Sequence, residues 1–344
     1  MKRINFIKAM AATALMFVFA VTSSSNASAA SDNIERFVCP APLQKGDLVA
    51  MICPSSCPPD RESVQRAKAV LESWGYRVEV ADHMFDEYHG CAGTPEQRRA
   101  LIEKYLRNPE VKCIFCYRGG KGSIRAMMDL PLDLIRRNPK WIVGYSDVTT
   151  MLSAWNAVGV MSLHGDMGCD LQRDDKGGES AELLRRMLAG KLPCYAFKRS
   201  AVKGVPANRP GHAEGRLLGG NAETMIPSLA SDMDGLSTGQ DLVLFLEDIN
   251  ADDVHIERVL CELKVHGLLD RLKGVVCGYF TDYRERSYPN VESMVEEFFA
   301  GYDIPVVYRF PAGHERPNYP LLMGSKVVLD VSADSVRLEF QKEQ

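Results

Sequence analysis

A serine at a predicted turn between a strand and a helix is the first candidate for chemistry. The apolar run 141–143 predicts a buried strand, the segment Gly-Tyr-Ser-Asp at 144–147 ends it, and apolar residues at steps of three and four then predict a helix. Such a turn exposes the Ser146 hydroxyl beside free backbone N–H groups. Ser146 is therefore either a nucleophile or only the cap of the helix. The usual nucleophile turn has glycine two residues after the serine, where this chain has Val148.

A serine nucleophile needs an imidazole as general base and a carboxylate that orients the imidazole. Of the seven histidines, His314 lies in the turn-rich segment 311–318 between two apolar strands, in the kind of loop where functional residues concentrate. It is either the base or a histidine whose hydrogen bonds are satisfied within its loop. His164, at the end of a predicted strand, is the second candidate for the base.

Two acids follow the predicted buried strand 243–246 and are candidates for the carboxylate. Glu247 and Asp248 come directly after this strand, where a charge is partly desolvated and needs a partner such as an imidazolium. Asp248 is equally suited to cap the following turn. The residues alone leave the choice between the two acids open.

The elements of the first half predict how these side chains are positioned. We expect strands at 48–53, 78–80, 111–117, 141–143 and 160–163, separated by helices. Strands that alternate with helices indicate a parallel sheet with crossover helices, whose sites form beyond the C-terminal ends of the strands. The glycine-rich loop 119–122 and Ser146 are both expected at that edge. The second half predicts strands at 242–246, 274–278, 305–310, 327–331 and 336–340, and helices at 254–263 and 291–299.

The N-terminus has the pattern of a secretory signal peptide. Three basic residues precede an apolar run from Ala9 to Val21, and Ala27-Ser28-Ala29 provides an A-x-A cleavage site. The apolar run is shorter than the about 20 residues of a membrane span. We therefore expect residues 1–29 to be removed and the mature protein to be periplasmic or extracellular, without a membrane anchor.

Charge and cysteine content exclude several classes of protein. Without residues 1–29 the chain keeps 38 basic and 45 acidic residues, a formal net charge of −7, and has no basic cluster for nucleic acid or anionic membranes. Ten cysteines spread over this length do not form the dense framework of a small disulfide-rich domain. Cys113 and Cys116 fall on opposite faces of one predicted strand, which argues against a zinc site. Cys53 and Cys57 flank a turn and are candidates for a pair.

Seven segments between Lys45 and Gly324 together resemble the LD-carboxypeptidase family of serine peptidases, which also includes the microcin-immunity peptidases. They are KGDLVAMICPSS, AGTPEQRRALIEKYLRNPEVKCIFCYRGGKGSIR, NPKWIVGYSDVTT, LHGDMG, LLGGN, LVLFLEDINADDVHIERVL and PAGHERPNYPLLMG. The resemblance implies an α/β protein with a Rossmann-like parallel sheet in the N-terminal domain and a smaller C-terminal α/β domain with a barrel-like sheet. Polar, charged and Pro- and Gly-containing segments place a junction at 176–210, so the two domains are expected at 30–175 and 211–344. It also implies a homodimer, and we expect no cofactor and no metal.

The resemblance further implies roles for individual residues. Ser146, Glu247 and His314 match the family's catalytic triad, with the serine in the first domain and the other two in the second. The oxyanion hole is implied to be the backbone N–H groups of Asp147 and Gly119. The residues expected to bind substrate are Arg118, Gly120, Lys121, His164 and Asn221.

Three departures from the family pattern fall near the expected substrate cleft. Lys121 stands where the family usually has tyrosine, Gly165-Asp166 replaces Gly-Pro, and Asn221 is followed by Ala-Glu rather than Leu-Ser. The expected function is an exported serine carboxypeptidase that hydrolyses the L,D amide bond to the terminal D-Ala of a peptidoglycan tetrapeptide, a small muropeptide. The alternatives are a peptidase for another amide, such as that of a peptide-nucleotide antibiotic, and a non-catalytic muropeptide-binding protein.

Overall fold

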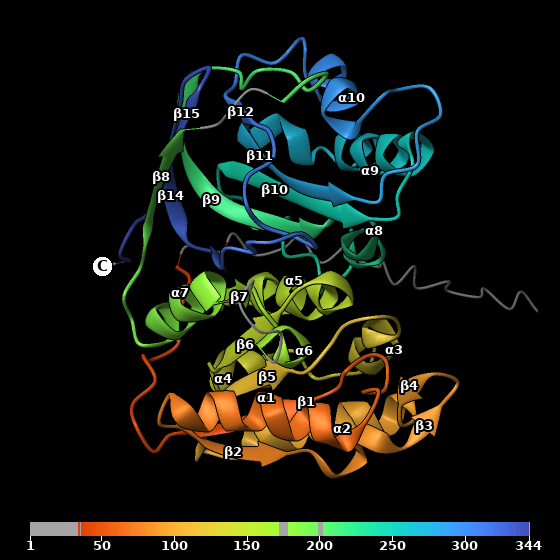
Figure 1. Ribbon diagram of the computed structural model, residues 1–344, viewed down its shortest axis with the longest axis vertical. Coiled ribbons are helices and arrows are strands. Elements are labelled where there is room, and N and C mark those ends of the chain that lie inside the picture. The colour runs from red at the N-terminus through yellow and green to blue at the C-terminus, as the bar shows by residue number, and fades with distance from the viewer. Residues whose placement is uncertain (1–33, 35, 172–177, 199–201, 344) are drawn as a thin grey trace, which may run out of the picture. The chain divides into compact units, whose positions relative to one another are not determined.

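A six-stranded sheet organises the first half of the chain (Figure 1). The computed structural model describes residues 34, 36–171, 178–198 and 202–343, so the predicted signal peptide lies outside the described residues. The sheet has the order β13-β7-β6-β5-β1-β2. Its strands are β1 (Leu48–Ile52), β2 (Arg77–Val80), β5 (Val111–Cys116), β6 (Trp141–Gly144), β7 (Ser162–His164) and β13 (Leu321–Met323). All neighbours are parallel except β7 and β13, which confirms the predicted parallel sheet.

The two longest helices of this half begin at side chains that accept hydrogen bonds from their first backbone N–H groups. Asp60 caps α1 (Arg61–Ser73) by accepting a 2.6 Å hydrogen bond from the Ser63 N–H. Thr94 and Gln97 form a capping box at α2 (Pro95–Arg107). The other helices are α3 (Ser123–Met127), α4 (Asp133–Arg137), α5 (Thr149–Ala157), α6 (Gly168–Leu171) and α7 (Gly178–Leu188), and a short hairpin joins β3 (Glu87–Tyr88) to β4 (Cys91–Ala92).

A seven-stranded sheet organises the second half, with the order β12-β11-β10-β9-β14-β15-β8. Its strands are β8 (Cys194–Lys198), β9 (Gly211–Asn221), β10 (Leu242–Ile249), β11 (Leu272–Thr281), β12 (Val306–Val307), β14 (Lys326–Val331) and β15 (Ser335–Phe340). β9 to β12 are parallel, whereas β14, β15 and β8 are antiparallel to their neighbours. The two outermost strands, β12 and β8, do not pair with each other among the described residues, and β12 instead bridges to Arg209 through Val306. The expected barrel-like sheet is therefore open and not a closed barrel.

Three helices cover one part of the second sheet. They are α8 (Ala222–Met225), α9 (Asp253–Val265) and α10 (Val291–Phe298), and the last two lie along β10 and β11 in Figure 1. Leu244 of β10, Ile256 of α9 and Val295 of α10 are fully buried in one apolar cluster. This packing fixes β10, whose C-terminal end carries the two candidate acids.

Two strands, β8 and β13, belong to sheets that the sequence does not predict for their segments. β8 falls in the expected junction 176–210 but pairs with β15 of the second sheet. β13 follows the His314 loop and pairs antiparallel with β7, with Leu321 opposite His164. Residues 31–344 form one compact unit by their contacts. The domain boundaries expected from the sequence remain a prediction.

None of the ten cysteines forms a disulfide bond. All ten cysteines carry free thiols, including Cys53 and Cys57, and Cys113 and Cys116 are fully buried in β5. Within the ranges that the structure describes, no helix combines the length and the apolar character needed to cross a membrane.

Candidate active site

Ser146 occupies a strained position between β6 and α5. Its φ is 61°, in the left-handed region that residues other than glycine seldom adopt. It begins a short 3₁₀ turn, η2 (Ser146–Val148), that leads into α5. A Cβ on Gly144 would lie 2.7 Å from a methyl of the buried Val148. The glycine that the tight turn needs therefore lies two residues before the serine, which explains how Val148 is accommodated after it.

The glycine-rich loop after β5 lies directly against this serine. A Cβ on Gly119 would be 3.2 Å from Ser146 Oγ and 3.3 Å from the backbone nitrogen of Asp147. The Asp147 carboxylate faces inward, where Oδ2 accepts hydrogen bonds from Ser55 Oγ at 2.5 Å and from the Ser123 N–H at 2.9 Å. The backbone of Gly119 and Asp147 thus borders the Ser146 hydroxyl, where an oxyanion hole is expected.

Glu247 and His314 form the closest acid–base pair of the site. His314 Nδ1 lies 2.7 Å from Glu247 Oε2, and the exposed fractions of the two side chains are 12% and 0%. Glu247 lies near the C-terminal end of β10, and His314 lies in the loop between β12 and β13. Burial opposes the charged imidazole, but the carboxylates of Glu247, Asp248 and Asp170 together raise the pKa of His314 above its ordinary value.

Asp248 has a different role from its neighbour. Its carboxylate accepts hydrogen bonds from Asn221 Nδ2 at 3.1 Å, from the Glu223 N–H at 3.1 Å and from the Ile249 N–H at 2.7 Å. Burial, followed by the charge of Glu247, raises the pKa of Asp248 to about 6. Asp248 therefore holds the turn into α8, and Glu247 is the acid that faces an imidazole.

Contacts between the two sheets bring the His314 pair to the serine turn. The rings of Tyr145 and His314 lie edge to face with their centroids 4.9 Å apart, and Tyr145 directly precedes Ser146. Thr224 Oγ1 donates a 3.1 Å hydrogen bond to the Ser146 carbonyl. Within the described residues, neither Ser146 Oγ nor His314 Nε2 makes a hydrogen bond, so both atoms are available to a ligand.

His164, the second candidate for the base, is enclosed in the core. It is fully buried between Tyr145 and Phe245, with ring centroids 5.7 and 4.9 Å away. Burial lowers the pKa of His164 to about 4. It is therefore neutral near pH 7, and its position does not support a direct contact with substrate.

The other residues expected to bind substrate lie around the glycine-rich loop and β9. Arg118 Nη1 donates to the Cys57 carbonyl at 3.0 Å. Gly120 is packed so closely that a Cβ would lie 2.1 Å from Ser56 Oγ. Lys121 is exposed, and its ammonium lies 3.7 Å from where a Cβ on Gly90 would be.

The Asn221 side chain makes its hydrogen bonds inside the protein. It caps α8, where its Oδ1 accepts from the Thr224 N–H at 3.1 Å and its Nδ2 donates to Asp248. The substrate-binding roles of these residues remain predictions.

Several residues that position the site are not predicted from the sequence. They are Ser55, Ser123, Tyr145 and Thr224. Ser55 follows the C-terminal end of β1, so the rule that places sites beyond strand ends pointed to it. Tyr145 and Thr224 act through contacts between segments distant in sequence, for which the local pattern gives no signal.

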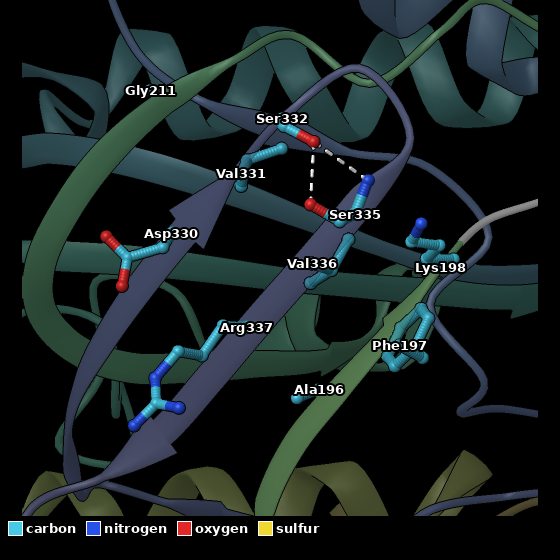
Figure 2. A pocket seen from close by; sticks show the side chains of 10 residues that line it. All are labelled: Ala196, Phe197, Lys198, Gly211, Asp330, Val331, Ser332, Ser335, Val336 and Arg337. Carbon is cyan, nitrogen blue, oxygen red and sulfur yellow. Dashed lines mark hydrogen bonds between the residues drawn. The ribbon is translucent and has the colours of Figure 1, made fainter.

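A hollow on the surface lies away from these residues. It has a volume of about 550 Å³ and is formed by β8, β14 and β15, where Ser332 and Ser335 hydrogen-bond to each other (Figure 2). None of the candidate site residues lines it. Across the described ranges, no three His, Cys, Asp or Glu side chains are grouped so that they could hold a metal ion.

An α/β fold with a serine on a strained strand-to-helix turn, and a carboxylate-paired histidine in contact with the residue before that serine, is compatible with a serine hydrolase. Comparisons with known proteins specify the class further. Residues 49–165 match the LD-carboxypeptidase N-terminal domain, and residues 214–329 match the LD-carboxypeptidase C-terminal domain. The chain belongs to the LD-carboxypeptidase family of serine-type carboxypeptidases, some members of which, such as MccF, act on other substrates.

Three relatives illustrate the range of the family. A putative carboxypeptidase of Synechocystis sp. is 30% identical over 88% of this chain and 97% of its own. The microcin C7 self-immunity protein MccF of Escherichia coli is 26% identical over 88% and 95% of the two chains. The crystal structure of a muramoyltetrapeptide carboxypeptidase from Oxalobacter formigenes superimposes with a TM-score of 0.74 at 27% identity and covers 86% of this chain and 99% of that chain.

Proposed function

We propose that the protein is an exported serine carboxypeptidase. It hydrolyses the L,D amide bond between a diamino acid and the terminal D-Ala of a peptidoglycan tetrapeptide. The observation that carries the proposal is the 2.7 Å pair of His314 and Glu247 beside the strained turn of Ser146. A solvated surface histidine has no need of a fully buried carboxylate, whereas a general base needs one to fix its tautomer.

The proposed mechanism assigns one role to each residue of the triad. Ser146 Oγ attacks the carbonyl carbon, and His314 Nε2 takes the serine proton and returns it to the leaving amine. Glu247 keeps the proton of the imidazole on Nδ1, so that Nε2 is free to accept. Water then hydrolyses the acyl-enzyme by the same route. In substrate-free enzymes the hydrogen bond between nucleophile and base is often open and tightens only when substrate binds.

The Gly119 and Asp147 N–H groups are proposed to stabilise the oxyanion. The backbone of Gly119 packs against the Ser146 side chain and the Asp147 nitrogen, and the Asp147 carboxylate accepts hydrogen bonds from Ser55 and Ser123. Donors fixed in this way need no reorganisation when charge develops on the substrate oxygen. The glycine at position 119 is required because any side chain there would occupy the space beside the nucleophile.

The identity of the amide is the second part of the proposal. The name of the Oxalobacter relative supports a muramoyltetrapeptide substrate, and the pattern of residues 1–29 supports export to the compartment that contains peptidoglycan. The MccF relative supports one alternative, a peptide-nucleotide antibiotic amide. The other alternative is a muropeptide-binding protein without activity, which the paired Glu247 and His314 disfavour. A homodimer is proposed from the family resemblance.

The decisive experiment gives the purified mature chain a defined L,D-linked tetrapeptide and an aminoacyl-sulfamoyl nucleotide in parallel, and measures the masses of the products. We expect the tetrapeptide to lose its terminal D-Ala. Ser146→Ala should lose activity by on the order of 10⁴-fold or more while keeping the wild-type fold. Cleavage of the nucleotide conjugate alone would favour the first alternative. Near-wild-type turnover by folded Ser146→Ala would remove the triad from the proposal.

A further inference from the structure

A buried ionic cluster holds the loop that carries His314. Asp166 and Asp170 are both 1% exposed, and Arg316 pairs with Asp166 through Nη1 and with Asp170 through Nη2. One guanidinium therefore bridges two buried carboxylates that have no part in the proposed triad. Arg316 follows His314 by two residues, so this bridge acts on the His314 loop itself.

A second set of hydrogen bonds closes the same loop. Asp166 Oδ1 also accepts a 3.1 Å hydrogen bond from Asn318 Nδ2. Asn318 Oδ1 in turn accepts a 2.9 Å hydrogen bond from the N–H of Gly313, the residue before His314. The loop is thus fixed on both sides of the histidine, and Asp166 ties it to the end of β7, two residues after His164.

Asp170 connects the cluster to the serine side of the site. Its Oδ1 lies 3.4 Å from the hydroxyl of Tyr145, and its Oδ2 accepts a 3.0 Å hydrogen bond from the Met167 N–H. The Tyr145 ring packs against the His314 ring, and Tyr145 is bonded to Ser146. The cluster therefore contacts the side chain of the residue before the nucleophile and the loop of the imidazole at the same time.

Stability alone is a poor explanation for this arrangement. Burying two carboxylates and a guanidinium costs several kcal/mol per ion in desolvation, and apolar side chains of similar volume often stabilise a core as well or better. Among the residues that the structure describes, Asp166 Oδ2 has no hydrogen-bond partner, and burial followed by the charge of Asp170 raises the pKa of Asp166. An ion bridge does, however, fix direction and distance more tightly than an apolar contact.

Asp166 is also a position at which this chain departs from the family pattern, which has proline there. A proline side chain has no oxygen to accept from Arg316 or Asn318. We propose that Asp166 is a positioning residue for the general base: with Asp170 it holds Arg316, and through the loop it fixes the His314 ring relative to Ser146. This inference rests on the proposed function, because it assumes that His314 activates Ser146.

The test measures how fast a serine-directed phosphonate labels Ser146 in the full chain, which does not depend on the substrate. Asp166→Asn should slow labelling about 10- to 100-fold, the order of effect of a small misplacement of a catalytic group. On a cleaved muropeptide it should lower kcat with a change in KM below about threefold. In a His314→Ala background, Asp166→Asn should slow labelling no further, because Asp166 acts through His314.

A matched control separates positioning from stability. Glu343→Gln removes the charge that pairs with Arg216, whose side chain is 1% exposed and lies outside the site. It should lower the melting temperature without slowing the labelling of Ser146. If Asp166→Asn does not fold, Arg316→Lys serves in its place, because it keeps the charge but cannot bridge both carboxylates.

The outcomes distinguish the inference from the proposed function. Wild-type labelling rates in folded Asp166→Asn or Arg316→Lys would overturn the inference, as would equal slowing by Glu343→Gln. If the wild-type protein is labelled rapidly but cleaves no muropeptide, the substrate assignment fails, and slower labelling of Asp166→Asn still supports the positioning role.

Discussion

Gly313 packs against Glu247 so closely that a Cβ on the glycine would lie 2.9 Å from Glu247 Oε2, the oxygen that pairs with His314. Gly313 also has a φ of 122°, in the region that favours glycine. Two independent features therefore require glycine before the histidine. One is the backbone conformation, and the other is the lack of space for a Cβ beside Glu247.

Gly313→Ala should accordingly displace the acid or the loop and lower kcat by about 10- to 100-fold, since a small misplacement of a catalytic group has effects of this order. Gly46→Ala is the matched control, because Gly46 has a φ of 88° but nothing within 4 Å of a Cβ. It introduces similar backbone strain without a clash, and its kcat should stay near that of the wild-type protein. Equal losses of kcat in the two variants would show that strain, and not the contact with Glu247, is responsible.

The two candidate bases should respond differently to removal. His314→Ala should lose as much activity as Ser146→Ala, on the order of 10⁴-fold. His164→Ala should lose far less kcat, because this imidazole is neutral and enclosed, although the cavity that it leaves should cost about 2–5 kcal/mol of stability. The measurement is the kcat of each variant, normalised to its folded fraction. A greater loss in His164→Ala would mean that the base has been assigned wrongly.

The rate should depend on pH through His314. The base must be neutral to accept a proton, so kcat/KM should rise with pH through the pKa of His314, which its acidic neighbours raise above 6.5. Glu247→Gln removes the largest attraction for the charged imidazole, so the acid limb should move to lower pH while kcat falls about 10²- to 10⁴-fold. An acid limb that keeps its position in Glu247→Gln would contradict the pairing.

Lys121 tests how a free terminal carboxylate is recognised. Lys121 belongs to the glycine-rich loop and is exposed, with its ammonium near Gly90. Its flexible side chain is long enough to turn toward a ligand. Lys121→Met should raise KM for substrates with a free C-terminus by the equivalent of about 1–3 kcal/mol and leave an amidated analogue nearly unaffected. Equal effects on the two substrates would assign Lys121 to the solvated surface.

Export is tested at the N-terminus. N-terminal sequencing of the protein from fractionated cells should find a mature chain that begins near Ala30, outside the cytoplasmic membrane. Intact residues 1–29 on protein in the cytoplasmic fraction would refute the prediction.

Local patterns in the sequence were sufficient to predict the parallel sheet and the turn at Ser146. The apolar run before Ser146 and the spacing after it depend only on neighbours in the chain, and the structure has β6 and α5 at those places. The choice between Glu247 and Asp248 could not be made in this way. It depends on which acid faces His314 and which faces Asn221, and those partners are distant in sequence.

The ionic cluster could not be predicted from the sequence for the same reason. In the sequence, Asp166 is one polar residue after a predicted strand, and Arg316 is one cation in a polar loop. Their pairing becomes evident only when β13 is found beside β7, because that pairing carries the His314 loop to the first sheet. A short strand such as Leu321–Met323 has too few residues for its sheet to be predicted from periodicity.

The position of β13 also constrains how the chain can acquire its structure. A protein is synthesised from its N-terminus, and the outer edge of β7 has no partner until residues 321–323 have been made. During that interval the unpaired edge can bind other extended segments, a known route to aggregation. A fragment that ends before residue 321 would keep this edge open permanently, so we expect the first sheet to be recovered as soluble protein only from nearly full-length chains.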